Sequence, residues 1–353
     1  MPGLTTRFKF AWSKNWRRLA ALALGLLVSV PAAAVVVKHS GRGGVSHVMS
    51  CGRSGDSLFE ADDWLSQKLV PSAQEEAWCD QNGKRVYDVR YRTDEFGRRV
   101  TPQTAEAAYD SFALFAGCSN TFGQGVNDDE TLPARFAQHV AGRKIKVYNY
   151  GVPSWGPANF LALLTDPRFA PGIKERRGFL VYTFIDHHVD RAIGRLNWLR
   201  TTTVPCYQAA ANGGLERCGL MDADHPPLHN YPLGEFNVRK KFTLKKLDWP
   251  AEIRAADIEL TARMFEEACR AFKRQFESTG FFVLAYPNAG LHLQMKYYFM
   301  KDDCGVKVLD YSALYRGTPD RNSFEFPDGH PRPNAYQDLA DRLYGELSNM
   351  GVF

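Results

Sequence analysis

The stretch SFALFAGCSNTFGQG, residues 111–125, joins an apolar run to a short polar segment rich in small residues. A continuous apolar run bounded by glycine is typical of a strand that is buried on both faces of a sheet. We therefore predict a strand over residues 111–117. The polar segment then forms a tight turn that presents Ser119 at the carboxyl end of this strand.

Four later segments repeat the apolar pattern, and helical patterns separate them. The further strands are expected at 144–151, 178–185, 280–287 and 306–312, and the helices at 131–141, 157–166, 254–278 and 334–348. Strands that alternate with helices predict an α/β fold with a parallel sheet covered by helices on both faces. In such sheets, ligands bind beyond the carboxyl ends of the strands.

Two regions depart from this alternation and divide the chain. Residues 41–110 form an N-terminal extension, in which residues 85–102 (RVYDVRYRTDEFGRRVTP) indicate a β-hairpin or a small β extension. Residues 195–250 form a long insertion rich in Pro, Gly and polar residues, which is uncommon unless it binds something or is mobile. We therefore expect a leader at 1–40, the extension at 41–110 and a catalytic-type domain at 111–353.

The basic charge of the chain is concentrated in its first 40 residues. The formal net charge is +5, from 44 basic and 39 acidic residues, and six of the basic residues lie in residues 1–40 with no Asp or Glu beside them. The remainder is electrically balanced and has no nucleic-acid footprint. We therefore expect no nucleic acid among the partners.

An apolar run, residues 19–37 (LAALALGLLVSVPAAAVVV), follows this basic segment and allows two interpretations. The part up to Val30 with Ala32 and Ala34 behind it has the pattern of a cleaved signal peptide. The whole run to Val37 is also about long enough to span a bilayer, and this length favours an anchor in the inner membrane slightly. Both interpretations place the rest of the chain on the periplasmic or extracellular side.

Seven cysteines fit an oxidising compartment. Cys206 and Cys218 bracket a polar, glycine-containing segment and are expected to form a bridge, and Cys51 with Cys79 is a plausible second pair. Cys269 lies on the apolar face of the helix expected at 254–278, so a buried thiol and a bridge to Cys304 stay equally open.

Two serines compete for the role of nucleophile. Ser57 lies in the letters Gly-Asp-Ser-Leu, residues 55–58, but the segment after it, residues 58–69, is predicted to begin an exposed helix that Asp56 or Ser57 caps. Ser119 directly follows the first predicted core strand. A serine also needs a base with an orienting carboxylate, and Asp328 and His330 lie two residues apart between the last strand and the last helix.

These segments, in this order, resemble the conserved blocks of SGNH/GDSL-type serine hydrolases, over roughly residues 111–350. The four blocks are GCSNTFGQGVNDDETLP, NYGVPSWGPAN, YTFIDHHVDR and PDGHPRPNAY. The resemblance implies a flavodoxin-like three-layer α/β/α sandwich with a five-strand parallel sheet. It also implies that Ser119 is the nucleophile, His330 the base and Asp328 its acid, with the N–H groups of Ser119 and Gly151 in the oxyanion hole.

The chain departs from the family pattern at two positions. Cys118 replaces the Asp of the first block, which is not the triad acid, and a buried small residue is the expectation there. The third block lacks the Asn that donates to the oxyanion, and His188, or less favourably His187, is expected to replace it. Losing one such donor costs about 2.7–4 kcal/mol in other enzymes.

The resemblance predicts a serine esterase that removes O-acyl groups, with acetyl favoured, from an envelope or extracellular glycan. Trp155, in the second block, is the candidate surface on which a sugar stacks. An O-acetyltransferase and a non-catalytic binding or assembly protein are the alternatives. No cofactor is expected, and no metal site, because the adjacent His187 and His188 fit neither a helical i,i+4 pair nor paired Cys/His spacing.

Overall fold

A parallel sheet of five strands forms the centre of the protein. This computed structural model describes residues 35–39, 47–104, 108–210, 214–224, 250, 252–317 and 321–353. The five strands are β7 (Ser111–Gly117), β8 (Ile145–Gly151), β9 (Arg177–Phe184), β12 (Glu277–Ala285) and β13 (Val306–Asp310). They lie in the order β13-β12-β9-β7-β8, and every pair of neighbours is parallel. The α/β fold class predicted from the sequence is confirmed.

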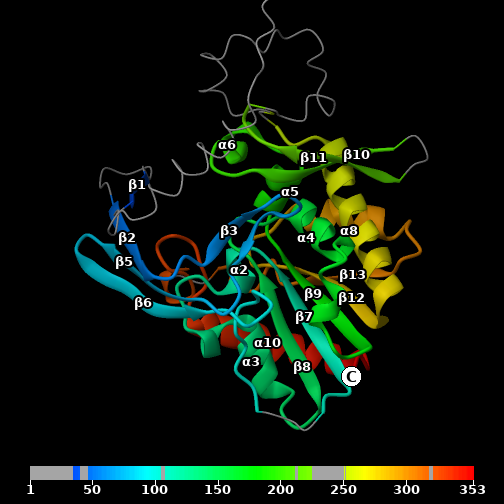
Figure 1. Ribbon diagram of the computed structural model, residues 1–353, viewed down its shortest axis with the longest axis horizontal. Helices are drawn as coiled ribbons and strands as arrows, with labels where there is room; N and C mark the ends of the chain where they lie inside the picture. The colour runs from blue at the N-terminus through cyan, green and yellow to red at the C-terminus, as the bar shows by residue number, and fades with distance from the viewer. Residues whose placement is uncertain are drawn as a thin grey trace, which may run out of the picture.

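Helices cover both faces of this sheet and complete the three layers (Figure 1). One face packs on α3 (Leu132–His139) and α10 (Pro333–Asn349), through an apolar cluster that joins Phe115 and Phe136 to Leu339. The other face packs on α4 (Pro157–Thr165), α8 (Ala255–Gln275) and α9 (His292–Phe299). The shorter helices are α2 (Ser119–Phe122), α5 (His187–Ala192), α6 (Leu196–Leu199) and the 3₁₀ turns η1 (Asp128–Glu130), η2 (Ala170–Gly172) and η4 (Arg321–Ser323).

The strand order places the end of β7 at a switch point of the sheet. β7 is hydrogen-bonded to β8 on one side and to β9 on the other, so the connections after β7 and after β8 leave in opposite directions. A crevice at such a point, beyond the carboxyl ends of the strands, is where open α/β sheets bind ligands. Ser119 begins α2 two residues after β7 ends.

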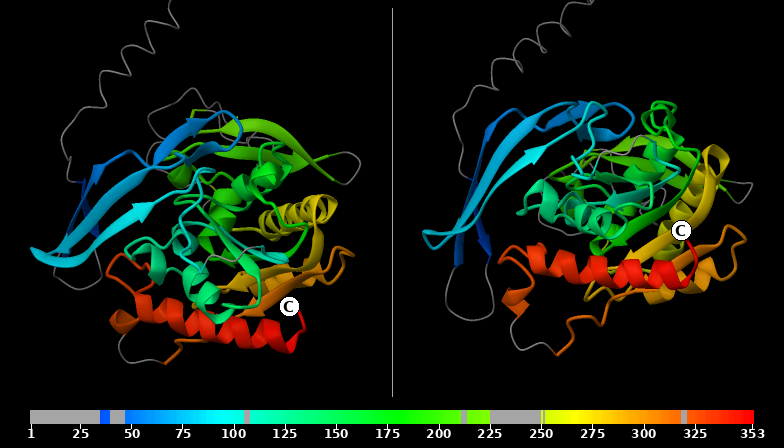
Figure 2. Two further views of the ribbon diagram at one scale, coloured as in Figure 1. Left: turned by 60° about the horizontal axis from the view of Figure 1, so that its bottom comes forward. Right: turned by 90° about the horizontal axis from the view of Figure 1, so that it is seen from below.

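The N-terminal extension is a four-stranded antiparallel sheet at one side of the central body (Figure 2). Its strands β1 (Val35–His39), β2 (His47–Gly55), β5 (Gln74–Gln81) and β6 (Lys84–Arg92) lie in the order β1-β2-β5-β6. Residues 85–102 contain most of β6, which pairs with β5 upstream of it. Within the segment itself, the strand pairing that the structure describes is the isolated bridge from Thr93 to Arg99. The prediction of a small β extension is therefore the better of the two alternatives.

The helix expected over residues 58–69 is wrong. The segment forms the hairpin of β3 (Phe59–Asp62) and β4 (Ser66–Leu69). Leu58 and Leu69 are buried in the same apolar cluster as Phe112 of the central sheet, which explains why strand pairing wins over a surface helix. Ser57 caps no helix: its hydroxyl lies 3.1 Å from the carbonyl oxygen of Phe59 in an exposed turn. The domain boundary at residue 110 stays a prediction.

The insertion is more regular than expected. β10 (Val204–Ala209) and β11 (Leu215–Met221) form an antiparallel hairpin, and the predicted Cys206–Cys218 bridge joins them. The part at 225–249 lies outside the described residues. The hairpin packs against α4, so this part of the insertion covers one of the helices on the central sheet.

The N-terminal apolar run lies largely outside the described residues. Val35, Val36 and Val37, its last three members, belong to strand β1 and pair with β2. Among the residues that the structure describes, no helix is long and apolar enough to cross a membrane.

Three disulfides connect the described cysteines. Cys51–Cys79 joins β2 to β5, as predicted, and Cys269–Cys304 joins α8 to the segment before β13. The sequence left a buried thiol and a bridge to Cys304 equally open for Cys269, and the structure shows the bridge. Cys118 is a buried free thiol, as expected.

The Cys269–Cys304 bridge lies next to a cluster of charged residues on α8 and the segment before β13. Arg270 pairs with both Glu267 and Asp302, whereas Glu266 faces Asp302. Burial, and then the charge of Asp302, raise the pKa of Glu266 to about 7, although Arg270 and Arg263 oppose the shift. A raised pKa in the folded state means that this carboxyl stabilises the fold below its unfolded pKa and loses that contribution as the pH rises through about 7.

We therefore expect Glu266→Gln to stabilise the protein in mild alkali but not in mild acid. Thermal unfolding at pH 5 and pH 8 measures this. The melting temperature of the variant should exceed that of the wild type at pH 8 and match it at pH 5. An equal difference at both values would show that the carboxyl does not titrate between them.

Candidate active site

A sharp turn between β7 and α2 presents Ser119. Gly117, the last residue of β7, has a φ of 147°, and a Cβ there would lie 2.4 Å from the Thr121 hydroxyl. Gly123 ends α2 in the left-handed region, with a φ of 88°. Two glycines thus confine the helix to a single turn, with Ser119 as its first residue.

His330 and Asp328 come from a second tight turn, between β13 and α10. Gly329 between them has a φ of 86°, and the N–H of Phe326 donates to the carbonyl of His330 at 2.7 Å. This closed turn holds both side chains on one side. The imidazole Nε2 of His330 lies 2.8 Å from Oγ of Ser119, across 211 positions of sequence. The structure therefore brings the three predicted triad residues together.

The second nitrogen of His330 faces the carboxylate. Nδ1 lies 3.0 Å from Oδ2 of Asp328, within hydrogen-bonding distance, but the N–H is not aimed directly at the oxygen. Burial alone would raise the pKa of Asp328, yet the nearby imidazole of His330 and the backbone N–H of His330, which donates to Oδ1 at 3.2 Å, outweigh it and hold the pKa below its usual range. Asp328 is therefore ionised at neutral pH and holds the proton on Nδ1, which leaves Nε2 to accept the proton of Ser119.

Helix α10 fixes the nucleophile relative to the base. It begins at Pro333, three residues after His330. Its Tyr336 is buried and donates its hydroxyl to the carbonyl of Asn120, at 2.7 Å. The helix that follows the base is thus hydrogen-bonded to the residue that follows the nucleophile. The sequence analysis gave Tyr336 no role, although it lies in the fourth block, at the start of an apolar helix face.

Gly151 does not present its N–H to the site as expected. That N–H donates to Oδ1 of Asn149 at 2.9 Å. A Cβ on Gly151 would lie 2.2 Å from the backbone nitrogen of Phe122, so the glycine is required for the close approach of β8 to α2. The prediction that Gly151 donates to the oxyanion is corrected for this physical reason.

Ser154 is the residue that the sequence analysis missed in this loop. It is a non-glycine residue with a φ of 72°, and its N–H has no partner among the described residues. The loop begins at Val152, whose N–H donates to the carbonyl of Gly117 at 3.1 Å, beside the nucleophile turn. Ser119, at the first position of α2, likewise has an N–H without a partner in the described part of the chain.

His188 cannot replace the missing third-block Asn, which corrects a second prediction. Its side chain is completely buried, and its ring packs edge-on against Tyr182 and Phe184. Burial lowers the pKa of His188 well below its usual range, so the ring is neutral. A side chain without solvent access cannot reach a substrate oxyanion. His187 is exposed and pairs with Asp190 at 3.1 Å.

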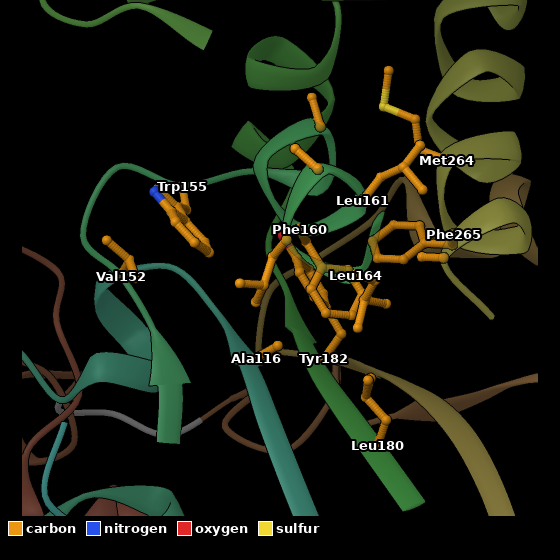
Figure 3. Packing of buried hydrophobic residues seen from close by; sticks show 14 of the residues in the cluster. Ala116, Val152, Trp155, Phe160, Leu161, Leu164, Leu180, Tyr182, Met264 and Phe265 are labelled. Atoms are coloured by element: carbon orange, nitrogen blue, oxygen red, sulfur yellow. The ribbon is translucent and has the colours of Figure 1, made fainter. Parts of the chain in front are cut away.

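Trp155 is not a surface for sugar stacking. It is 3% exposed, and Figure 3 shows its indole among the buried residues of the cluster. Its indole N–H donates to the carbonyl of Gln67 at 3.0 Å. The guanidinium of Arg191 donates to the carbonyl of Trp155 at 2.7 Å. Trp155 therefore anchors the loop that carries Ser154, and the prediction that it binds substrate is wrong.

Comparison with known proteins gives structural likenesses alone. No family model matches the chain, and neither does any curated protein sequence. An acetyl xylan esterase from the rumen bacterium Butyrivibrio proteoclasticus is 10% identical, with a TM-score of 0.38, over 93% of this chain and 98% of that one. An SGNH-hydrolase family esterase is 11% identical, with a TM-score of 0.31, over 70% of this chain and 98% of that one.

The chain has a three-layer α/β/α fold around its five-strand parallel sheet. Its strand order places the serine after β7 within hydrogen-bonding distance of the Asp-Gly-His turn before α10. Among the residues that the structure describes, no three His, Cys, Asp or Glu side chains are grouped so as to hold a metal ion.

The close approach at Gly151 makes a testable prediction. Gly151→Ala keeps the N–H but places a methyl group against the backbone of Phe122, so α2 must shift. We expect a destabilisation of about 1–3 kcal/mol and a loss of at least tenfold in any activity that depends on Ser119. Gly345→Ala on α10, where a Cβ meets nothing within 4 Å, is the matched control and should keep both. Full activity in Gly151→Ala would contradict the packing argument.

Proposed function

We propose that this protein is a serine ester hydrolase. The observation that carries the proposal is the 2.8 Å contact between Ser119 Oγ and His330 Nε2, with Asp328 on the other nitrogen of the ring. A serine hydroxyl is a weak nucleophile until a positioned base removes its proton, and a carboxylate that orients the base completes the arrangement.

The reaction has two half-reactions. His330 takes the proton of Ser119 as Oγ attacks the ester carbonyl, and then gives that proton to the leaving alcohol. Water, deprotonated by the same imidazole, attacks the acyl-enzyme, and the proton returns to Ser119 as the acid leaves. The N–H groups of Ser119 and Ser154 are the proposed donors to the oxyanion, because both lie beside the turn and neither has a partner in the described residues. This replaces Gly151 and His188 in that role.

The proposed substrate is an O-acyl group, with acetyl favoured, on an envelope or extracellular glycan. The side chains of His330 and Asp328 are 18% and 21% exposed and lie in a surface turn, which suits an ester carried on a polymer. Three disulfides are consistent with a periplasmic or extracellular location.

The pairing of Val35, Val36 and Val37 with β2 supports a cleaved signal peptide over an anchor. If the last three valines pair in a sheet, the uncharged apolar run before them covers residues 19–34. A spanning helix needs about 20 residues. Edman sequencing of the protein purified from an exporting host gives the test: a start at Val35 supports release, whereas a start at Met1 supports the anchor.

The first activity prediction separates the two candidate serines. Ser119→Ala should abolish hydrolysis of p-nitrophenyl acetate, because it removes the hydroxyl that contacts His330 Nε2 at 2.8 Å. Ser57→Ala should stay within about twofold of wild type, since its hydroxyl bonds only its own turn. Normal hydrolysis by Ser119→Ala would refute the assignment. Adding an acetylated and a deacetylated glycan separates a hydrolase, which releases acetate, from a transferase, which moves acetyl to the acceptor.

The second activity prediction concerns the unit formed by Ser119 and His330. Residues that act as one unit are not additive. His330→Ala should therefore lower kcat about as much as Ser119→Ala, and the double variant should be no slower than either single variant. Asp328→Asn should retain the fold and lower kcat, because the amide no longer selects the tautomer. Independent, multiplying losses in the double variant would disprove the triad.

A further inference from the structure

Arg99, in the N-terminal extension, is a completely buried cation beside the nucleophile turn. Its side chain is 0% exposed, and its backbone forms isolated bridges with Thr93 and with Asn149 of β8. A buried guanidinium is costly unless its donors are satisfied. The hydrogen-bond partners of the Arg99 guanidinium therefore indicate which part of the structure this side chain stabilises.

The partners of Arg99 are the carbonyls that end helix α2. Nη1 donates to the carbonyl of Phe122 at 3.2 Å and to that of Gly123 at 3.4 Å. Nη2 donates to the carbonyl of Val126 at 3.0 Å. One side chain thus binds the last residue of the nucleophile helix, its C-cap and the loop that follows.

The charge of Arg99 is neutralised and its plane is fixed. Nε donates to Oδ1 of the buried Asp128 at 2.7 Å. The guanidinium lies over the rings of Tyr91 and Phe122, at 4.4 Å and 4.5 Å from their centroids. The guanidinium is planar and is held between two rings, so its N–H groups have fixed positions. It therefore restricts the movement of the carbonyls to which it is hydrogen-bonded.

A helix of one turn needs such support. Its nucleation is unfavourable without tertiary contacts, and its last carbonyls have no partner inside the helix. Ser119 and Phe122 are the two ends of α2, and three residues of helix span only about 4.5 Å. Any tilt at Phe122 therefore moves Ser119 Oγ relative to His330. A displacement of about 1 Å can cost on the order of 100-fold in rate.

We propose that Arg99 is a positioning residue for Ser119. It fixes the C-terminal end of α2 and so keeps the hydroxyl in reach of His330 Nε2. The inference rests on the proposed esterase function and extends it, because it makes the N-terminal extension part of the catalytic unit. A purely structural role would change how much protein folds, whereas a positioning role changes the rate at each folded site.

The test is Arg99→Lys, which keeps a cation but cannot reach Asp128 and three carbonyls together. The number of competent sites is counted by titration with a fluorophosphonate that phosphonylates Ser119. The expected result is a 10- to 100-fold lower kcat per titrated site on p-nitrophenyl acetate, with KM within twofold. The rate of phosphonylation should fall in parallel.

Arg92→Gln is the matched control. Arg92 also donates to Asp128, at 2.6 Å, but its side chain is 51% exposed, and it has no recorded bond to a carbonyl of α2. Its kcat per site should stay within twofold of wild type. An equal loss in Arg92→Gln would assign the effect to Asp128 and overturn the proposal, as would an unchanged kcat per site in Arg99→Lys.

A second variant decides the matter if Arg99→Lys does not fold. Arg99→Met with Asp128→Asn removes both charges of the buried pair and so leaves neither one unpaired. It should show the same loss per titrated site. Failure of both to fold, beside a folded Arg92→Gln, would show a structural role alone and overturn the inference. A wild type that neither hydrolyses the ester nor reacts with the fluorophosphonate would refute the esterase function itself, and the inference with it.

Discussion

The hydrogen bond from the Tyr336 hydroxyl to the carbonyl of Asn120 joins the last helix of the chain to the turn after the first strand of the central sheet. The nucleophile follows the first strand of the central sheet and the base follows the last, so their meeting depends on how the final helix packs. Tyr336 is buried with Leu339 and Leu343 on the face of α10 that covers the sheet. The burial of this apolar face therefore stabilises the fold and sets the register between Ser119 and His330 together.

The nucleophile turn is held by contacts from three different parts of the chain. Tyr336 holds Asn120 from the side of α10, and Asn149 of β8 donates to the carbonyl of Thr121 at 3.1 Å. Arg99 binds the far end of the turn from the extension. A one-turn helix has almost no stability of its own, so its geometry is set by tertiary contacts. The extension contributes no member of the proposed triad, but through Arg99 it helps to fix the turn that carries Ser119.

The sequence predicted the secondary structure well in segments where the apolar pattern fits one type of element. The five core strands are near-continuous apolar runs, and the observed bounds differ from the predicted ones by a few residues at most. Ser119, Asp328 and His330 could be chosen because the strand order places both turns at one edge of the sheet. Residues 58–69 were misread because Leu58, Leu65 and Leu69 are buried by partners distant in sequence, and a local pattern cannot show such partners.

The proposed oxyanion donors could not be chosen from the sequence, because the choice depends on which N–H groups are already hydrogen-bonded. Gly151 satisfied the family pattern, yet its N–H is taken by Asn149, two residues earlier in the same strand. His188 had suitable chemistry, but the fold buries it between aromatic rings. The backbone of Ser154 has a positive φ that a serine rarely adopts. The loop is fixed by the hydrogen bond from the Arg191 guanidinium to the carbonyl of Trp155. Such strain persists only where the surroundings fix it, and it clusters at functional sites. The third-block Asn is missing from this chain, so the reaction proposed above relies on backbone N–H groups to stabilise the oxyanion, and Arg191 and Trp155 fix the loop that carries one of them.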